Sequence, residues 1–369
     1  MTSALTRIPQ IIPWIGAEEK AAVGNVLDDN WLTEGPRSRA FAERLNSLIG
    51  SPYGVFAPNG TLALALGLMG LGISTGDEVI VPDCTFIGSA TSVILAGGRP
   101  VFVDVEENTC QIDMTKAARA LTSRTKAIMP VHLMGTSADM NAVMAFASAH
   151  GLKVIEDAAQ GIGVSYRNRH IGSIGDVGCF SFFADKTLTT GEGGFVTCKD
   201  EETYQRLRLL RNQGRPNSGT FIHPMIGFNF RITDLQAAIG LAQLDRLPEI
   251  IARKADNLAL YREFLDGQPH VRILGAARDS SHVPFRCVLM CDDAGALAEH
   301  LTANQIETRG FFYPMHKQPC FVERYGSEDD AHYPAAIKAH ERGMCLPIYP
   351  GMTKADIRRI ADAIKSFYG

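Results

Sequence analysis

The alternation of short apolar runs with helical segments is the feature of the sequence that most restricts its fold. It extends from about residue 55 to residue 198, where segments such as TLALALGLMGLG and DMNAVMAFASAHG precede or separate the runs. Short strands that are apolar on both faces and alternate with helices indicate a largely parallel sheet covered by helices on both sides. We therefore expect an α/β fold with strands at Glu78–Pro82, Pro100–Val105, Lys126–Leu133, Lys153–Asp157, Val177–Phe183 and Gly194–Cys198.

After Cys198 the pattern changes to long amphipathic helices. ETYQRLRLLRNQG and TDLQAAIGLAQLDRLPEIIARKADNLALYREFL place apolar residues three and four positions apart. We expect Pro248 to interrupt the second helix, because proline removes a hydrogen bond from the helical ladder. Beyond about Ile273 the strand VPFRCVLMC and two further helices indicate a smaller α+β region. The prediction is an N-terminal arm and large domain in residues 1–248, followed by a small C-terminal domain in residues 249–369.

Composition excludes several classes of function. Lys and Arg number 36 against 40 Asp and Glu, so the net charge is −4, whereas a nucleic-acid-binding protein is expected to carry a clustered basic excess. The eight cysteines include no CxxC pair, which predicts no metal site and suggests packing residues in a reducing compartment. No apolar run approaches the thickness of a bilayer and no secretion signal is recognisable. We expect a soluble cytoplasmic protein with no metal, nucleic-acid or membrane partner.

The stretch CFSFFADKTLTTGEGG, residues 179–194, contains one lysine at the end of a predicted core strand. Lys186 is either an ordinary surface residue at a strand end or an amine held at a reactive centre. Ligands of parallel sheets bind outside the carboxyl ends of the strands, which is where Lys186 lies. A buried lysine with a lowered pKa becomes a nucleophile. Ser181 offers a hydroxyl, and the glycines at 191, 193 and 194 would let the backbone run close to a ligand.

Three other segments are each ambiguous by themselves. Asn59-Gly60-Thr61 opens an apolar helix, where backbone amides form either an anion site or a simple turn and N-cap. Asp157 ends a predicted strand, where it caps the next helix or holds a protonated ring nitrogen. Phe86, in PDCTFIGSA, is either a core residue or a platform for a flat ring. Together with Lys186 they are the parts that pyridoxal 5′-phosphate requires: a phosphate cradle, a carboxylate for the ring nitrogen, a stacking aromatic and an amine for the aldehyde.

In these residues the chain resembles the StrS/DegT-type sugar aminotransferases, pyridoxal-phosphate enzymes that aminate keto sugars carried on nucleotides. The resemblance covers nearly the whole chain. It rests on the order and spacing of the blocks WLTEGP, NGTLALALGL, GDEVIVPDCTF, KAIMPVHLMG, VIEDAAQGIG, SFFADKTLTTGEGG, GFNFRITDLQAAIGLAQL and GFFYPMHKQP. It implies the aspartate-aminotransferase-like fold, called fold type I, in which the large domain binds pyridoxal phosphate.

The resemblance also implies roles for single residues. Lys186 falls on the catalytic lysine that forms the Schiff base, Asp157 on the partner of the ring nitrogen, and Gln160 on the residue beside the ring hydroxyl. Other positions match the phosphate binders (Gly60, Thr61 and Ser181), the stacking aromatic (Phe86), an asparagine that reaches the cofactor phosphate of the neighbouring subunit (Asn229) and the substrate-binding residues (Trp31, Tyr313, His316 and Arg231, which is close to Asn229). Without the resemblance, Asn229 is explained equally well as part of a turn at a helix entry, and His316 as a surface residue. The role of Asn229 would make the protein a homodimer with shared active sites.

The expected reaction is transamination from an amino acid to a nucleotide-linked keto sugar, with glutamate as the expected amino donor. Within this family, KTLTTGEGG and FYPMH most resemble the enzymes that aminate carbon 4 of a GDP-linked 4-keto-6-deoxy sugar, and the resemblance implies that acceptor. The alternatives are a 3-keto nucleotide sugar, a pyridoxal enzyme acting outside sugar metabolism, and a cofactor-binding regulator. Relatives with histidine in place of the lysine remove a hydroxyl, so Lys186 disfavours a dehydratase. A dinucleotide-binding dehydrogenase is disfavoured because no G-x-G-x-x-G follows a first strand.

Overall fold

The computed structural model describes residues 6–217, 219 and 221–369. The first five residues of the expected N-terminal arm lie outside this part of the chain. A seven-stranded sheet forms the centre of the fold, in the order β1-β9-β8-β5-β4-β2-β3. Its strands are β1 Tyr53–Ala57, β2 Glu78–Pro82, β3 Arg99–Val103, β4 Thr125–Ile128, β5 Lys153–Asp157, β8 Val177–Ser181 and β9 Gly194–Cys198.

The sheet is parallel except at β9, which runs antiparallel to β1 and β8. All residues of β2, β8 and β9 are buried, as their continuous apolar runs predict. The expected boundaries of β2, β5 and β9 are confirmed. The run from Lys126 to Leu133 forms a regular strand only as far as Ile128, because Pro130 has no N–H group to donate to the ladder. Val131 still forms an isolated bridge with Asp157 of β5, and a short 3-10 turn follows at Leu133–Gly135.

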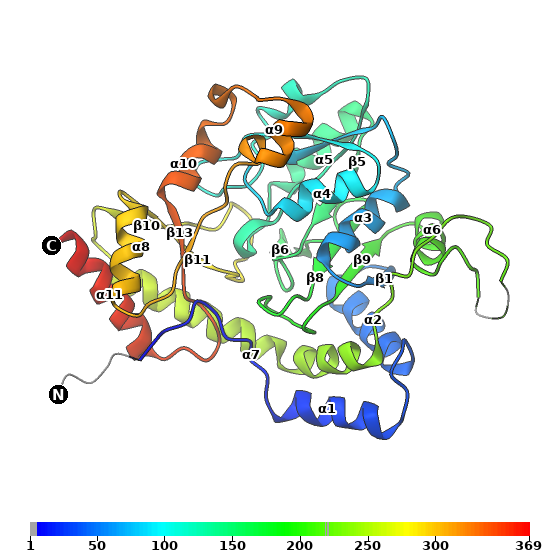
Figure 1. Ribbon diagram of the computed structural model, residues 1–369, viewed down its shortest axis with the longest axis horizontal. Coiled ribbons are helices and arrows are strands. Elements are labelled where there is room, and N and C mark those ends of the chain that lie inside the picture. Colours follow the sequence, from blue (N-terminus) through cyan, green and yellow to red (C-terminus); the bar gives the residue numbers. More distant parts are fainter. Residues whose placement is uncertain (1–5, 218, 220) are drawn as a thin grey trace.

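Helices cover both faces of the sheet (Figure 1). One apolar cluster joins it to α3 Gly60–Gly70, α4 Ile87–Leu95 and α6 Glu201–Arg211, and a second joins it to α2 Pro36–Ile49, α5 Met140–His150 and the first half of α7 Asp234–Phe264. Helix α3 is buried from Ala63 to Leu68. Its Gly67 packs against Val177 and Cys179 of β8, so the helix lies very close to the sheet.

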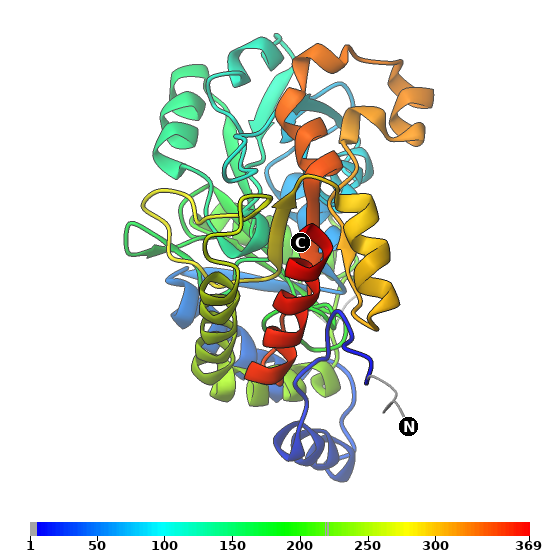
Figure 2. The ribbon, with the colours of Figure 1, turned by 90° about the vertical axis from the view of Figure 1, so that its left-hand side faces the viewer.

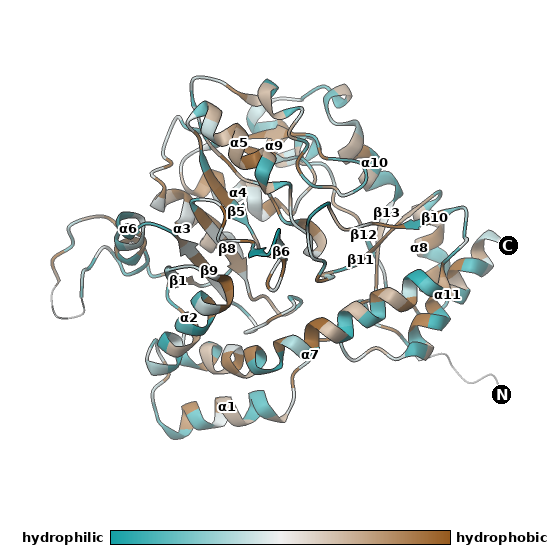
Figure 3. Ribbon diagram, turned by 180° about the vertical axis from the view of Figure 1, so that it is seen from behind, coloured by the Kyte–Doolittle hydropathy of each residue, from teal (hydrophilic) through white to brown (hydrophobic). Residues whose placement is uncertain are grey.

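A second, antiparallel sheet has the order β10-β11-β13-β12. Its strands are β10 Val271–Ile273, β11 Cys287–Cys291, β12 Arg309–Gly310 and β13 Gly343–Leu346. A separate apolar cluster joins this sheet to the end of α7, α8 Ala294–Ala303 and α11 Lys354–Tyr368, and Figure 2 shows the two shorter helices beside the sheet. Figure 3 shows teal and brown residues side by side along α11, because only one face of that helix is buried.

The remaining elements are short or peripheral. They are α1 Ala17–Asp28, α9 Pro319–Tyr325, α10 Pro334–Arg342 and the two-stranded sheet of β6 Ser165–Tyr166 and β7 Arg169–His170. Among the described helices, none combines the length and apolarity that a membrane span needs.

The expected interruption of α7 at Pro248 is wrong. The helix continues through Pro248 from Asp234 to Phe264. Contacts with α1, α2 and α11 hold α7 along its length, and this tertiary packing outweighs the hydrogen bond that proline removes.

The start of α7 also fixes the start of α2. The buried Asp234 carboxylate accepts hydrogen bonds from the backbone N–H groups of Gly35 at 2.9 Å, Arg37 at 3.1 Å and Ser38 at 2.9 Å. It therefore satisfies backbone donors that the first turn of α2 leaves free, and ties two helices that are distant in the sequence.

We predict that Asp234→Ala lowers the free energy of unfolding by about 2–5 kcal/mol, because it leaves several buried donors without an acceptor. Urea denaturation measures the change. Asp245→Ala is the matched control on the same helix, since Asp245 pairs with Arg44 on the surface, and should cost less than about 1 kcal/mol. Equal losses in the two variants would contradict the prediction.

Candidate active site

Lys186 lies on the loop between β8 and β9, where the structure holds the backbone tightly. Phe182 N–H donates to the carbonyl of Gly193 at 2.8 Å, and Thr190 N–H donates to the carbonyl of Phe182 at 2.9 Å. The Lys186 side chain is partly exposed, and its Nζ lies 4.3 Å from the centre of the Phe285 ring. Burial of the amine lowers the pKa of Lys186, although Asp185 and Asp157 act in the opposite direction. The amine therefore loses its proton more readily than an ordinary lysine.

Asp157 lies at the end of β5 and is 4% exposed. Ser89 Oγ, on α4, donates to Asp157 Oδ2 at 2.7 Å, and Ala159 N–H donates to Oδ1 at 3.1 Å. Burial raises the pKa of Asp157, while these hydrogen bonds and the charge of Lys186 act against the rise. A cation beside Asp157 would therefore further stabilise its carboxylate form.

The start of α3 meets the ends of β8 and β9. Asn59 caps the helix by accepting a hydrogen bond from Leu62 N–H at 3.0 Å. A Cβ added at Gly60 would lie 2.7 Å from Cβ of Ser181, and one added at Gly194 would collide with the carbonyl oxygen of Asn59. Glycine is required at both positions, and the close approach brings Gly60, Thr61 and Ser181 together at a helix N-terminus, a common anion site.

Phe86 lies beside this cluster, whereas Gln160 contacts the 3-10 turn at Leu133–Gly135. Phe86 precedes α4 and is 59% exposed, so its ring is not a core residue. A Cβ added at Gly88 would touch both Thr61 Oγ1 and the Phe86 ring, which places Phe86 beside the start of α3. Gln160 Oε1 accepts a hydrogen bond from Met134 N–H at 2.7 Å.

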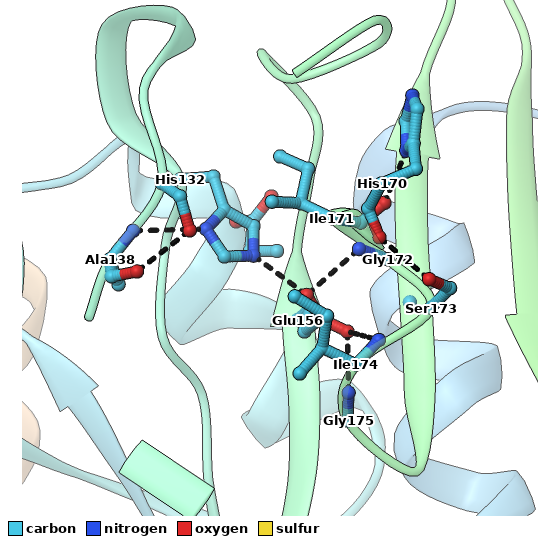
Figure 4. A network of polar contacts seen from close by, with 12 residues as sticks. His132, Ala138, Glu156, His170, Ile171, Gly172, Ser173, Ile174 and Gly175 are labelled. Carbon is cyan, nitrogen blue, oxygen red and sulfur yellow. Dashed lines mark hydrogen bonds and ion pairs between the residues drawn. The ribbon is translucent and has the colours of Figure 1, made fainter. Parts of the chain in front are cut away.

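A buried network beneath β5 was not expected from the sequence (Figure 4). Glu156 accepts hydrogen bonds from the backbone N–H groups of Gly172 at 2.8 Å, Ile174 at 2.7 Å and Gly175 at 2.6 Å, and its Oε2 lies 3.0 Å from His132 Nε2. Burial alone would raise the pKa of Glu156, but the bonds from His132 and from the backbone outweigh it, and the pKa lies below its usual value. The network fixes the residue that directly precedes Asp157.

The other expected site residues lie farther out. Trp31 and Asn229 are exposed, and Asn229 pairs through the backbone with Asn212. Arg231 donates to Asn212 Oδ1 at 2.7 Å. In the described part of the chain, no hydrogen bond or ion pair joins these residues to the Lys186 loop.

His316 and Tyr313 belong to the segment that precedes α9. His316 is buried between two carboxylates: Nδ1 lies 2.7 Å from Asp83 Oδ2, and Nε2 lies 3.2 Å from Asp330 Oδ1. Tyr313 is 41% exposed and packs edge-on against His340. Through its contact with Asp83, His316 holds this segment against the end of β2. The Tyr313 side chain remains accessible.

Sequence reasoning missed Ser89, Phe285, Arg286 and Lys254, all of which lie near Lys186 or Asp157. Phe285 and Arg286 were assigned only to a strand, and Lys254 only to an amphipathic helix. None carries a local motif, since each reaches the site through long-range contacts.

Comparisons with known proteins agree with this geometry. The model of the DegT/DnrJ/EryC1/StrS aminotransferase family matches residues 13–365. The GDP-perosamine synthases of Escherichia coli O157:H7 and Caulobacter vibrioides are 35% and 38% identical to the chain, each over 98% of both proteins. A UDP-N-acetyl-3-dehydro-alpha-D-glucosamine 3-aminotransferase of Acidithiobacillus ferrooxidans is 38% identical over 93% of the chain and 92% of that protein.

Solved structures share the fold. S. venezuelae DesV superposes with a TM-score of 0.91 at 34% identity, covering 95% of this chain and 94% of that chain. The PLP-form of the putative sugar aminotransferase Spr1654 from Streptococcus pneumoniae has a TM-score of 0.92 at 26% identity, covering 98% of each chain. The expected α/β fold of type I is confirmed by these neighbours.

We predict that Glu156→Gln lowers the free energy of unfolding by about 3 kcal/mol at pH 7, because the carboxylate accepts several buried N–H groups. Since its folded pKa lies below the unfolded value near 4.5, this stabilisation is complete above that pH and is lost as the pH falls through the folded pKa. Urea denaturation at pH 7 and pH 3.5 measures both effects. The exposed Glu202→Gln is the control, and a pH-independent difference between wild type and Glu156→Gln would contradict the prediction.

Proposed function

The chain belongs to the DegT/DnrJ/EryC1/StrS aminotransferase family, and we propose that it uses pyridoxal 5′-phosphate at Lys186 to move an amino group from glutamate to a nucleotide-linked keto sugar. The observation that supports this most strongly is the grouping of a partly buried lysine of lowered pKa, a buried carboxylate and a glycine-lined helix start.

The residues present fit the cofactor. The N–H groups of the first turn of α3 have no acceptor within the helix, and Gly60 lets that turn approach the Ser181 hydroxyl, as a phosphate group requires. The Asp157 carboxylate, oriented by Ser89, would hold the ring nitrogen in its protonated form. The exposed ring of Phe86 is free to stack on a flat group.

When bound, pyridoxal phosphate supplies an electron-withdrawing ring that stabilises negative charge on the carbon bearing the amine. Lys186 would anchor the cofactor until an amino donor displaces it, and its amine would then carry the proton between carbon atoms. A lysine of lowered pKa suits that task, because it has to accept and release a proton near neutral pH.

For the acceptor we propose a GDP-linked 4-keto-6-deoxy sugar, aminated at carbon 4. The two GDP-perosamine synthases at 35% and 38% identity support this choice. The second candidate is a 3-keto UDP-sugar, which the 3-aminotransferase at 38% identity supports. The product in either case would serve the synthesis of amino sugars for polysaccharides, in the cytoplasm.

We also propose that the chain has two domains. Residues 1–248 would form the N-terminal arm and the large domain that binds the cofactor, and residues 249–369 would form the small C-terminal domain. The two separate sheets support it.

A homodimer with shared sites is part of the proposal. The segment after α6 projects away from the sheet (Figure 1) and exposes the apolar side chains of Phe221, Ile222 and Ile226 by 86%, 75% and 86%. Exposed apolar side chains gathered on one segment are typical of an interface. A second copy seated there would bring Asn229 to the cofactor phosphate of the neighbouring subunit.

The cofactor proposal predicts a visible absorption band after incubation with pyridoxal phosphate, bleached by glutamate. Lys186→Ala should not form this band from the cofactor alone, and its turnover should fall by at least a thousandfold, because the covalent anchor and the proton carrier are both lost. Once bleached, the wild-type protein should recover the band with the GDP-linked 4-keto sugar. Recovery only with a 3-keto UDP-sugar would favour the second candidate, and a wild-type protein without any band would contradict the cofactor assignment.

The shared-site proposal predicts that Asn229→Ala and Lys186→Ala complement each other. Each variant alone should lose at least 90% of activity, whereas mixed dimers from co-expression should regain part of it, because one of their two sites combines intact residues from both subunits. Activity and sedimentation of the purified mixture measure this. Absence of complementation in a mixture shown to contain mixed dimers would contradict shared sites.

A further inference from the structure

Lys254, on α7, is a buried lysine that forms no ion pair with any residue the structure describes. Its side chain is 2% exposed. Within the described part of the chain its one hydrogen bond runs from Nζ to Thr187 Oγ1, at 3.1 Å. Burying an ammonium group without a carboxylate is costly. Because burying this amine is costly, we infer that Lys254 has a role beyond packing.

The contact with Thr187 places Lys254 directly at the loop of Lys186. Both neighbours of Lys186 in the sequence are held by basic side chains. Thr187 receives the hydrogen bond from Lys254, and Asp185 forms an ion pair with Arg286. The loop therefore has an anchor on each side of the reactive lysine.

The two lysines also lie near the same aromatic ring, that of Phe285. Lys186 Nζ lies 4.3 Å from the centre of the Phe285 ring, Lys254 Nζ lies 5.8 Å from it, and the guanidinium carbon of Arg286 lies 4.6 Å from it. A cavity of about 20 Å³ is lined by Asp185, Lys186 and Lys254 together. The charge of Lys186 acts on Lys254, and two like charges that line one small cavity repel each other.

We propose that Lys254 is a positioning residue for the proposed transamination: its amine holds the Lys186 loop through Thr187, and its protonation adds a second ammonium group near Lys186. This inference rests on the proposed function. Uncharged Lys254 leaves Lys186 free to act as a base or to carry a proton. Charged Lys254 makes the protonated form of Lys186 more costly.

The surroundings of Lys254 support a change of charge near neutral pH. Burial, followed by the charge of Arg286, lowers the pKa of Lys254 to about 7, against the pull of Asp185. The charged groups that face it are Asp185, Lys186 and Arg286. His282 also lies near it, and burial lowers the pKa of that imidazole to about 4, so His282 is neutral throughout the range that matters.

The first experiment uses the cofactor-free protein and measures urea unfolding from pH 7.5 to 9.5. The unfolded chain binds a proton on Lys254 up to about pH 10.4, but the folded chain releases it near pH 7, so stability should rise with pH in this window. Lys254→Met removes that contribution. The ratio of the unfolding constants of wild type and variant should fall by up to about tenfold per pH unit, and a ratio independent of pH would overturn the proposal.

The second experiment follows the visible band of the protein loaded with pyridoxal phosphate as a function of pH. In Lys254→Met the midpoint of the band should move to higher pH, by at least a threefold change in the acid dissociation constant, because the second positive charge is gone. Lys254→Gln keeps a donor for Thr187 but no charge, so it should shift in the same way. The exposed Lys126→Met is the matched control and should keep the wild-type midpoint.

The outcomes separate this inference from the proposed function. If the wild-type protein forms the band and its pH midpoint is the same in Lys254→Met, Lys254→Gln and Lys126→Met, the cofactor assignment stands and the proposed role of Lys254 is overturned. A wild-type protein that forms no band overturns the proposed function and this inference with it. Loss of turnover in Lys254→Met alone, with an unchanged midpoint, would also count against it, because it reports only a structural role.

Discussion

The close approach of helix α3 to strands β8 and β9 is the constraint on which the site depends. Gly60 and Gly194 leave no room for a side chain between the helix start and the strand ends, and the buried face of α3 holds the contact along its length. The approach sets the free amides of the helix next to Ser181 and next to the loop that carries Lys186. Any side chain at either glycine would push the start of α3 away from the strand ends.

Strand β5 carries the carboxylate of the candidate site, because its successive side chains point to opposite faces of the sheet. Asp157 points to the face of α4, where Ser89 orients it, and Glu156 points to the opposite face, where His132 and a ring of backbone amides hold it (Figure 4). Burial raises the pKa of Asp157, whereas hydrogen bonds stabilise the neighbouring Glu156 in its charged form. The pKa values of two adjacent acids therefore shift in opposite directions, because successive residues of a strand point to opposite faces of the sheet.

The sequence was sufficient for features that depend on local pattern. Strands apolar on both faces, the glycine-bounded start of α3 and the lysine at a strand end could all be predicted, since each depends on neighbouring residues. The continuity of α7 through Pro248 could not, because packing against three other helices decides it. Neither could the group around Lys186: Lys254, Phe285 and Arg286 come from distant parts of the chain and carry no motif. The sequence pattern does not show which distant segments come into contact in the folded chain.

The most direct test of the central claim is to locate the lysine that holds pyridoxal phosphate. Borohydride reduction of the loaded protein fixes the cofactor on its amine, and peptide mass spectrometry then identifies the residue. We predict a single adduct on Lys186, whose Nζ lies nearer the Phe285 ring than that of Lys254 and whose charge acts on Asp157. An adduct on Lys254 instead, or one spread over surface lysines, would contradict it.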